Sequence, residues 1–271
     1  MLKHRQPEHH HHRIRTLLIA GAIGCMGLVA VSWYAMRERT PPNPIEQKEF
    51  IQSILISAEK NNHTILKQRQ HLSALYTRAI LHKEPLDYLQ TIEFHHLVNT
   101  YHIKNADPND IKTWHELFIR LNIVPNSLII SQAIIESAWG RSRFAIEANN
   151  YFGQACFTVD CGAKPDKPGK SDPEKSDAAK SHREVTYFSE LDTSVASYMR
   201  NLNTNPAYAD FREERYRLQQ NHHPITGGEL VQTLGHYSQE HQVYVKHIHE
   251  IIYKFDLAKY DVTDSEPMPV K

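Results

Sequence analysis

The chain has 271 residues, of which 40% are hydrophobic and 23% are charged. It can therefore bury one core of roughly 150 residues and carry flanking segments, which excludes an intrinsically disordered protein. Thirty-one basic residues balance thirty-one acidic ones, so the strong positive field of a nucleic-acid-binding protein is also excluded.

The first predicted element is an uncharged apolar run from Leu17 to Met36, with arginines on both sides. Its length suits one membrane span, and a slight excess of positive charge before it favours an inside N-terminus. We predict a short N-terminal tail over residues 1–12 and a signal anchor or transmembrane helix over 13–36. A cleaved signal peptide is the alternative interpretation.

Residues 37–123 are predicted to form a linker and a helical, membrane-proximal region. The prolines of residues 41–44 indicate a stiff, extended spacer. Apolar residues at helical spacing then predict amphipathic helices over 50–75, interrupted near Asn61 and Asn62, and over 86–101 and 111–121.

A lone carboxylate, Glu136, stands in the next helical pattern. Pro125 to Ser127 can start this helix, and Gly140 can end it in a left-handed conformation after about three turns. Isoleucine and alanine residues surround Glu136 at helical spacing, so we expect a partly apolar setting that raises its pKa. A carboxyl group of this kind suits a general acid.

Two short strands are predicted next, over 154–159 and 183–188, joined by a long loop over 161–183. Cys156 and Cys161 enclose four residues and favour a disulfide in an oxidising compartment, with a zinc site as the weaker alternative. Helical patterns return over 193–202, 230–234 and 245–255.

Four motifs carry a resemblance that covers residues 124–258. They run over 131–144 around Glu136, 149–154, 197–211 and 235–244. In this order they resemble the glucosaminidase domain of family 73 glycoside hydrolases, in its bacterial Bax-type branch. The resemblance implies a mainly α, lysozyme-like α+β fold with a small β-hairpin lobe, followed by a C-terminal tail over 259–271.

The same resemblance implies a peptidoglycan hydrolase that cleaves the β-1,4 bond after N-acetylglucosamine. It implies a bacterial inner-membrane location with the catalytic domain in the periplasm, or secretion into the periplasm after signal cleavage. Peptidoglycan glycan strands would be the partner, with the membrane contacted through the N-terminal helix. No cofactor and no metal are expected.

The resemblance places Glu136 at the general-acid position, where it would protonate the leaving glycosidic oxygen. Glu184 is the candidate second carboxylate, and Tyr237 is expected to position the acetamido group or stabilise developing charge. Asn149 and Asn150 are expected to fix the turn beneath the cleft through their side-chain amides. The residues expected to contact substrate are Trp139, Asn149, Asn150, Tyr151, Phe152 and Gly153.

Three alternatives stay open at this point. A lytic transglycosylase would share the fold and the single glutamate, although its Gly-Leu-Met-Gln signature is absent here. An inactive, membrane-tethered wall-binding or scaffold protein would keep the fold without turnover. Histidines at 236, 241, 247 and 249 could bind a metal, but His247 and His249 do not share one helix face easily.

Overall fold

The computed structural model describes residues 42–155, 162–163, 185–237 and 241–261. The predicted membrane span, Glu184, Cys156 and Cys161 lie outside the described residues, so these predictions stay untested. Within the described ranges, no helix has both the length and the apolar composition needed to cross a membrane.

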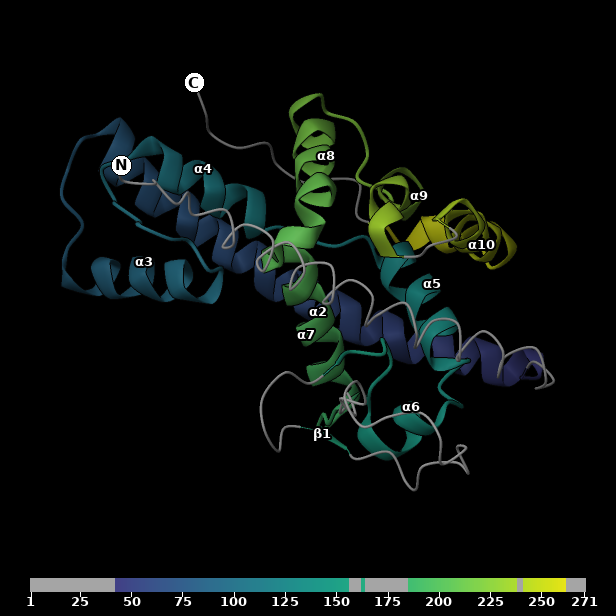
Figure 1. Cartoon of the computed structure of the whole chain (residues 1–271). Coiled ribbons are helices and arrows are strands. Elements are labelled where there is room, and N and C mark those ends of the chain that lie inside the picture. Colours follow the sequence, from purple (N-terminus) through teal and green to yellow (C-terminus); the bar gives the residue numbers. More distant parts are fainter. Residues whose placement is uncertain (1–41, 156–161, 164–184, 238–240, 262–271) are drawn as a thin grey trace, which may run out of the picture.

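The described chain is mainly helical, which confirms that part of the predicted fold class (Figure 1). The predicted helices over 86–101, 111–121, 193–202 and 245–255 are confirmed as α3, α4, α7 and α10. The elements in chain order are α2 (Pro44–Tyr76), the π-helical turn η1 (Thr77–Leu81), α3 (Tyr88–Thr100), α4 (Ile111–Arg120), α5 (Asn126–Ser137), α6 (Arg143–Ala148), β1 (Gly162–Ala163), β2 (Val185–Thr186), α7 (Leu191–Thr204), η2 (Pro206–Tyr208), α8 (Ala209–Gln220), α9 (Gly227–Leu230), η3 (Val231–Tyr237), α10 (His241–Lys254) and η4 (Leu257–Tyr260).

The long helix α2 runs through the middle of the described helices, as Figure 1 shows. It contacts α3, α4, α5 and α7, and one hydrophobic core runs from Ile51 to Leu257. The Asn43 side chain caps the helix, and Glu46 bonds back to the Asn43 backbone N–H. Pro44 therefore starts α2 and does not belong to the predicted spacer, since the first turn needs no N–H from it.

The predicted interruption near Asn61 and Asn62 is wrong, because α2 continues through both residues. The Asn62 side chain is buried and donates to the Val124 carbonyl at 2.8 Å and to Asn126 Oδ1 at 2.9 Å, while it accepts from the Val124 N–H at 3.1 Å. An asparagine whose polar groups are all used across the core does not compete for its own helix backbone. Asn62 thus fastens α2 to the start of α5.

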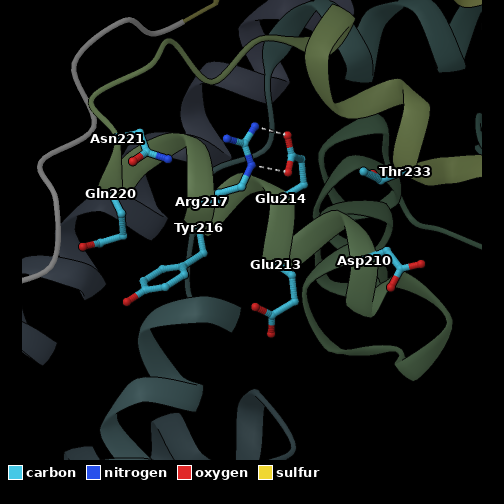
Figure 2. A pocket seen from close by; sticks show the side chains of 8 residues that line it. All are labelled: Asp210, Glu213, Glu214, Tyr216, Arg217, Gln220, Asn221 and Thr233. Carbon is cyan, nitrogen blue, oxygen red and sulfur yellow. Dashed lines mark hydrogen bonds and ion pairs between the residues drawn. The ribbon is translucent and has the colours of Figure 1, made fainter.

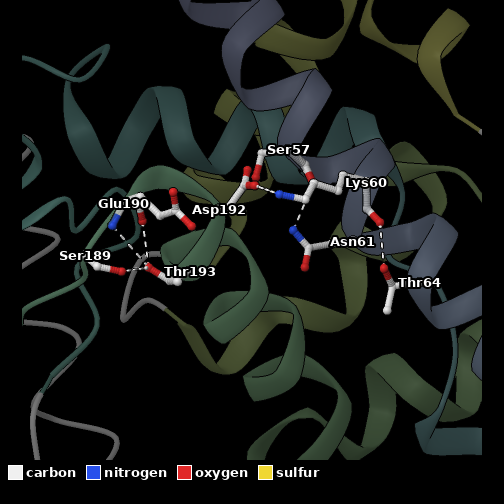
Figure 3. Close-up of polar contacts among 8 residues, drawn as sticks. All are labelled: Ser57, Lys60, Asn61, Thr64, Ser189, Glu190, Asp192 and Thr193. Atoms are coloured by element: carbon white, nitrogen blue, oxygen red, sulfur yellow. Dashed lines mark hydrogen bonds and ion pairs between the residues drawn. The ribbon is translucent and has the colours of Figure 1, made fainter.

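A second link joins α2 to α7. Lys60 forms an ion pair with Asp192, and Thr193 Oγ1 bonds to the backbone of Glu190 at the start of α7 (Figure 3). Both side chains of the ion pair are partly solvated, so its contribution to stability is small. It lies where α2 packs against α7.

Two buried arginines hold the connection between α4 and α5. Arg69 from α2 donates to the carbonyls of Phe118 and Leu121, both at 2.7 Å. Arg215 from α8 donates to the Ile123 carbonyl at 2.7 Å and the Ile119 carbonyl at 2.9 Å. These bonds satisfy carbonyls at the end of α4 that the helix itself cannot satisfy.

The described strands pair antiparallel, with Gly162 opposite Thr186 and Ala163 opposite Val185. The prediction assigned Gly162 and Ala163 to the loop, so that boundary is wrong, while Val185–Thr186 lies within the predicted returning strand. Ala155 also bridges Val185, as the first predicted strand requires. The rest of the predicted hairpin lobe lies outside the described residues.

Candidate active site

The helix that carries Glu136 is anchored at its first turn by a carboxylate from the far end of the chain. Asp261 accepts from the Ser127 N–H at 2.8 Å and from the Ser127 hydroxyl at 2.6 Å, and it also accepts from the Gly227 N–H at 3.1 Å. A negative charge at the N-terminus of α5 is favourable. The described fold therefore includes Asp261, whereas the sequence predicted that the domain ends at residue 258.

Helix α5 ends in an unusual turn. Ala138, Trp139 and Gly140 adopt φ values of 50°, 61° and 72°, so three successive residues are left-handed. The left-handed turn begins at Ala138 and not at Gly140 as predicted. The Ser137 hydroxyl secures it, since it donates to the Ala133 carbonyl at 2.5 Å and accepts from the Gly140 N–H at 2.7 Å.

Glu136 lies just before this turn, within protein on nearly all sides. A small part of the residue is accessible, and its Oε1 atom is buried. Burial raises the pKa of the carboxyl group from 4.5 to about 7, although a hydrogen bond with Tyr244 acts in the opposite direction. The position near the C-terminus of α5 also disfavours negative charge. The expected rise in the pKa of Glu136 is present, and burial is its largest cause.

Behind Glu136, three side chains from three helices form a hydrogen-bond chain. The Tyr198 hydroxyl of α7 donates to Gln132 Oε1, and Gln132 Nε2 of α5 donates to the Tyr244 hydroxyl of α10 at 2.6 Å. Tyr244 hydrogen-bonds to Glu136 in turn. Phe152 stacks on Tyr198 with ring centroids 4.1 Å apart. The Phe152 ring is thus buried against protein, which does not match the expected sugar contact.

The turn after α6 lies over the carboxylate. Asn149 is left-handed and donates to the Phe188 carbonyl at 2.9 Å. Asn150 donates to the carbonyls of Gln154 at 2.8 Å and Thr186 at 3.0 Å. The two amides hold this turn, as the sequence predicted. A Cβ at Gly153 would lie 3.7 Å from Glu136 Oε2, so the turn brings its backbone close to the acid.

Two aromatic residues expected to contact sugar lie beside this turn. Trp139 and Tyr151 are half-buried and pack around Phe50 of α2, with ring centroids 5.7 and 6.3 Å from it. Trp139 also packs edge-on against Phe255 at 5.1 Å. The upstream helix α2 therefore supports the wall next to Glu136, a role that the sequence did not suggest.

The structure leaves some predicted site residues untested and adds others. Glu184 lies outside the described residues, and only the backbone of Tyr237 is described, in η3. Gln132 and Tyr244 lie in the motifs over 131–144 and 235–244, but the sequence predicted no role for either residue. Their contact joins residues 112 positions apart, and no local spacing in the sequence could have revealed it.

A separate depression lies on α8, with a volume of about 620 Å³ (Figure 2). Its lining is rich in carboxylates, and Glu214 is engaged by Arg217 at 2.6 and 2.7 Å. None of its lining residues contacts Glu136 through a described bond. Among the described side chains, no three metal-binding groups converge on one point.

Comparison with known proteins identifies the family of the chain. The family model described as mannosyl-glycoprotein endo-beta-N-acetylglucosaminidase, the glucosaminidase family, matches residues 111–257, which is more than half of the chain. Protein bax of Escherichia coli (strain K12) is 33% identical over 131 residues, which cover 48% of this chain and 43% of that relative. No solved structure matches the chain. The chain belongs to the glucosaminidase family and is of the Bax type.

Proposed function

We propose that this protein hydrolyses the β-1,4 bond after N-acetylglucosamine in peptidoglycan glycan strands, with Glu136 as general acid. The observation that carries the proposal is the buried carboxyl group of Glu136, whose pKa of about 7 keeps a large fraction protonated at neutral pH. Membership of the glucosaminidase family supports a glycosidase that acts on peptidoglycan.

In this reaction Glu136 would donate its proton to the glycosidic oxygen as the bond to the sugar ring breaks. The Glu136 carboxylate that forms would accept the Tyr244 hydrogen bond. Tyr151 and Trp139 would line the sugar path, while Glu184 and Tyr237 stay candidates for activating water and for binding the acetamido group.

The test is digestion of purified sacculi by the full-length protein, beside its Glu136→Gln variant. Mass spectrometry of the products should show reducing N-acetylglucosamine ends from the parent, and a rate lower by a factor of about 10²–10⁴ for the variant. Equal rates from both proteins would overturn the proposal. Anhydro ends would instead indicate a lytic transglycosylase, and binding without release would indicate a wall-binding protein.

We also propose that the apolar run from Leu17 to Met36 anchors the protein in the inner membrane, with its body in the periplasm. The slight excess of positive charge before this run supports that orientation. A periplasmic body would allow a disulfide between Cys156 and Cys161. Alkylation of the protein isolated without reductant, followed by mass spectrometry, should leave these two cysteines unmodified; their full alkylation would exclude the disulfide.

A further inference from the structure

The hydrogen-bond chain behind Glu136 has a direction. Gln132, Tyr198 and Tyr244 are 1%, 1% and 6% exposed, so bulk water does not compete for their polar atoms. A primary amide accepts only through its oxygen and donates only through its nitrogen. Because Tyr198 occupies the oxygen of Gln132, the amide nitrogen is turned toward Tyr244.

This orientation decides what Tyr244 can offer to Glu136. The Tyr244 oxygen accepts from Gln132, so its single hydroxyl hydrogen is left for the carboxyl group. With the amide reversed, Gln132 would take that hydrogen, and oxygen lone pairs would face the carboxylate. Gln132, four positions before Glu136 on α5, thus decides whether Tyr244 presents a hydrogen or a lone pair to the Glu136 carboxyl group.

We propose that Gln132 is a positioning residue that makes Tyr244 a committed hydrogen-bond donor to Glu136 during catalysis. The inference rests on the proposed function, since it needs Glu136 to act as the acid. When the O–H bond of Glu136 breaks and its proton moves to the glycosidic oxygen, the new carboxylate receives the Tyr244 hydrogen bond. Tyr244 keeps its own proton throughout, so the chain stabilises charge and does not relay protons.

Among the described residues, Glu136 and Tyr208 are titratable groups that act on both tyrosines of this hydrogen-bond chain. Burial is the largest cause that raises the pKa of Tyr198 and Tyr244 well above the ordinary value, and the charges of Glu136 and Tyr208 act in the same direction. Tyr198 and Tyr244 are therefore neutral wherever the enzyme is assayed below pH 9. If a substitution in this hydrogen-bond chain moves the pH dependence of kcat/KM between pH 5 and pH 9, the shift therefore reports on the ionisation of Glu136.

The test compares full-length parent, Tyr244→Phe and Tyr76→Phe on soluble glycan strands over pH 5–9. Loss of the donor should lower kcat about 10–100-fold and leave KM within about twofold, because Tyr244 acts on the acid and not on the sugar. The alkaline limb of kcat/KM should move up by about one pH unit. Tyr76 is a matched control, since its ring is buried and its hydroxyl has no hydrogen-bond partner among the described residues.

Gln132→Met tests the orientation itself, because a thioether cannot donate to the Tyr244 oxygen and can only accept weakly from its hydroxyl. The Tyr244 hydrogen is then no longer fixed toward Glu136, so a fall in kcat and a shift of the alkaline limb in the same direction, but smaller than in Tyr244→Phe, are expected. Tyr198→Phe leaves the amide free to reverse, and a smaller change in the same direction is expected. If Tyr244→Phe does not fold, these two variants supply the same readouts. NMR titration of the Glu136 carboxyl carbon without substrate should show that the pKa of Glu136 is higher in these variants than in the parent.

The outcomes separate the two proposals. Activity retained by Glu136→Gln would overturn the proposed function. A second outcome concerns the hydrogen-bond chain alone. If Glu136→Gln is inactive but Tyr244→Phe and Gln132→Met keep the parental kcat and the parental alkaline limb, the proposed role of the hydrogen-bond chain is overturned and the proposed function stands. If Tyr76→Phe lowers kcat and moves the alkaline limb as much as Tyr244→Phe does, the effects come from packing. That result would also overturn the role of the hydrogen-bond chain.

Discussion

The backbone of Gly153 passes so near the carboxylate of Glu136 that a Cβ on the glycine would lie 3.7 Å from Oε2. Gly153 has φ of +62°, which costs an L-residue about 1–2 kcal/mol. We predict that Gly153→Ala loses about that much stability and loses more than tenfold in kcat/KM, because the strained turn must shift and its methyl group would occupy the space beside the Glu136 carboxylate, at van der Waals distance. Denaturant unfolding and kinetics on glycan strands measure the two effects.

The control for this prediction is Gly228→Ala. A Cβ at Gly228 meets nothing closer than His249 at 3.6 Å, and it lies in helix α9, where alanine is favoured. Stability and activity of this variant should match or exceed those of the parent. A fully active Gly153→Ala would show that the close approach to Glu136 has no catalytic importance.

Stability should depend on pH through Glu136. The folded protein holds the carboxyl proton up to a pKa of about 7, whereas the unfolded chain releases it near 4.5. The stabilisation is therefore complete below pH 4.5 and is lost as pH rises to 7, by up to about 3 kcal/mol. Glu136→Gln cannot ionise, so it escapes this loss.

We accordingly expect Glu136→Gln to be similar in stability to the parent at pH 4.5 and more stable by about 1–3 kcal/mol at pH 8. Guanidinium unfolding at the two pH values measures the difference, and other ionisable groups are common to both proteins. A difference that does not change with pH would mean that the Glu136 carboxyl group titrates near its ordinary value.

Adjacent asparagines on α2 should behave differently. Asn62 is buried and bonds to Val124 and Asn126. Asn61 is half-exposed, and its side chain donates to the Ser57 carbonyl of its own helix at 2.9 Å. Asn62→Ala should lose about 2–4 kcal/mol of unfolding free energy, since it leaves buried partners unsatisfied. Asn61→Ala should change it by less than about 0.5 kcal/mol. Equal losses would refute the link between α2 and α5.

A similar contrast applies to two aspartates near the C-terminus. Asp261 bonds to Ser127 and Gly227, while Asp256 is exposed and forms an ion pair with Lys259 at 3.0 Å. Asp261→Ala should lower the thermal midpoint clearly, with a free-energy loss of about 2 kcal/mol, and Asp256→Ala should leave it near the parental value. Differential scanning calorimetry makes the comparison, and an unaffected Asp261→Ala would exclude the anchoring role.

The sequence predicted the catalytic helix well because its signals are local. The starting residues, the apolar surroundings and the motif around Glu136 all lie within about fifteen positions, and α5 follows them. The predicted interruption of the helix near Asn61 and Asn62 was wrong, because the hydrogen-bond partners of Asn62 lie more than sixty residues away in the sequence. Tyr244 was missed for the same reason, and the left-handed run from Ala138 to Gly140 has only its glycine as a sequence signal.

The start of α5 is held by contributions from across the chain: Asn62 before it, Arg215 beyond it, and Asp261 at 134 residues' distance. Contacts this distant in sequence form late in folding, since the intervening chain must first be ordered. A chain truncated before Asp261 would therefore have an incompletely anchored α5. Such a truncation should loosen the helix that carries Glu136 although it removes no residue of that helix.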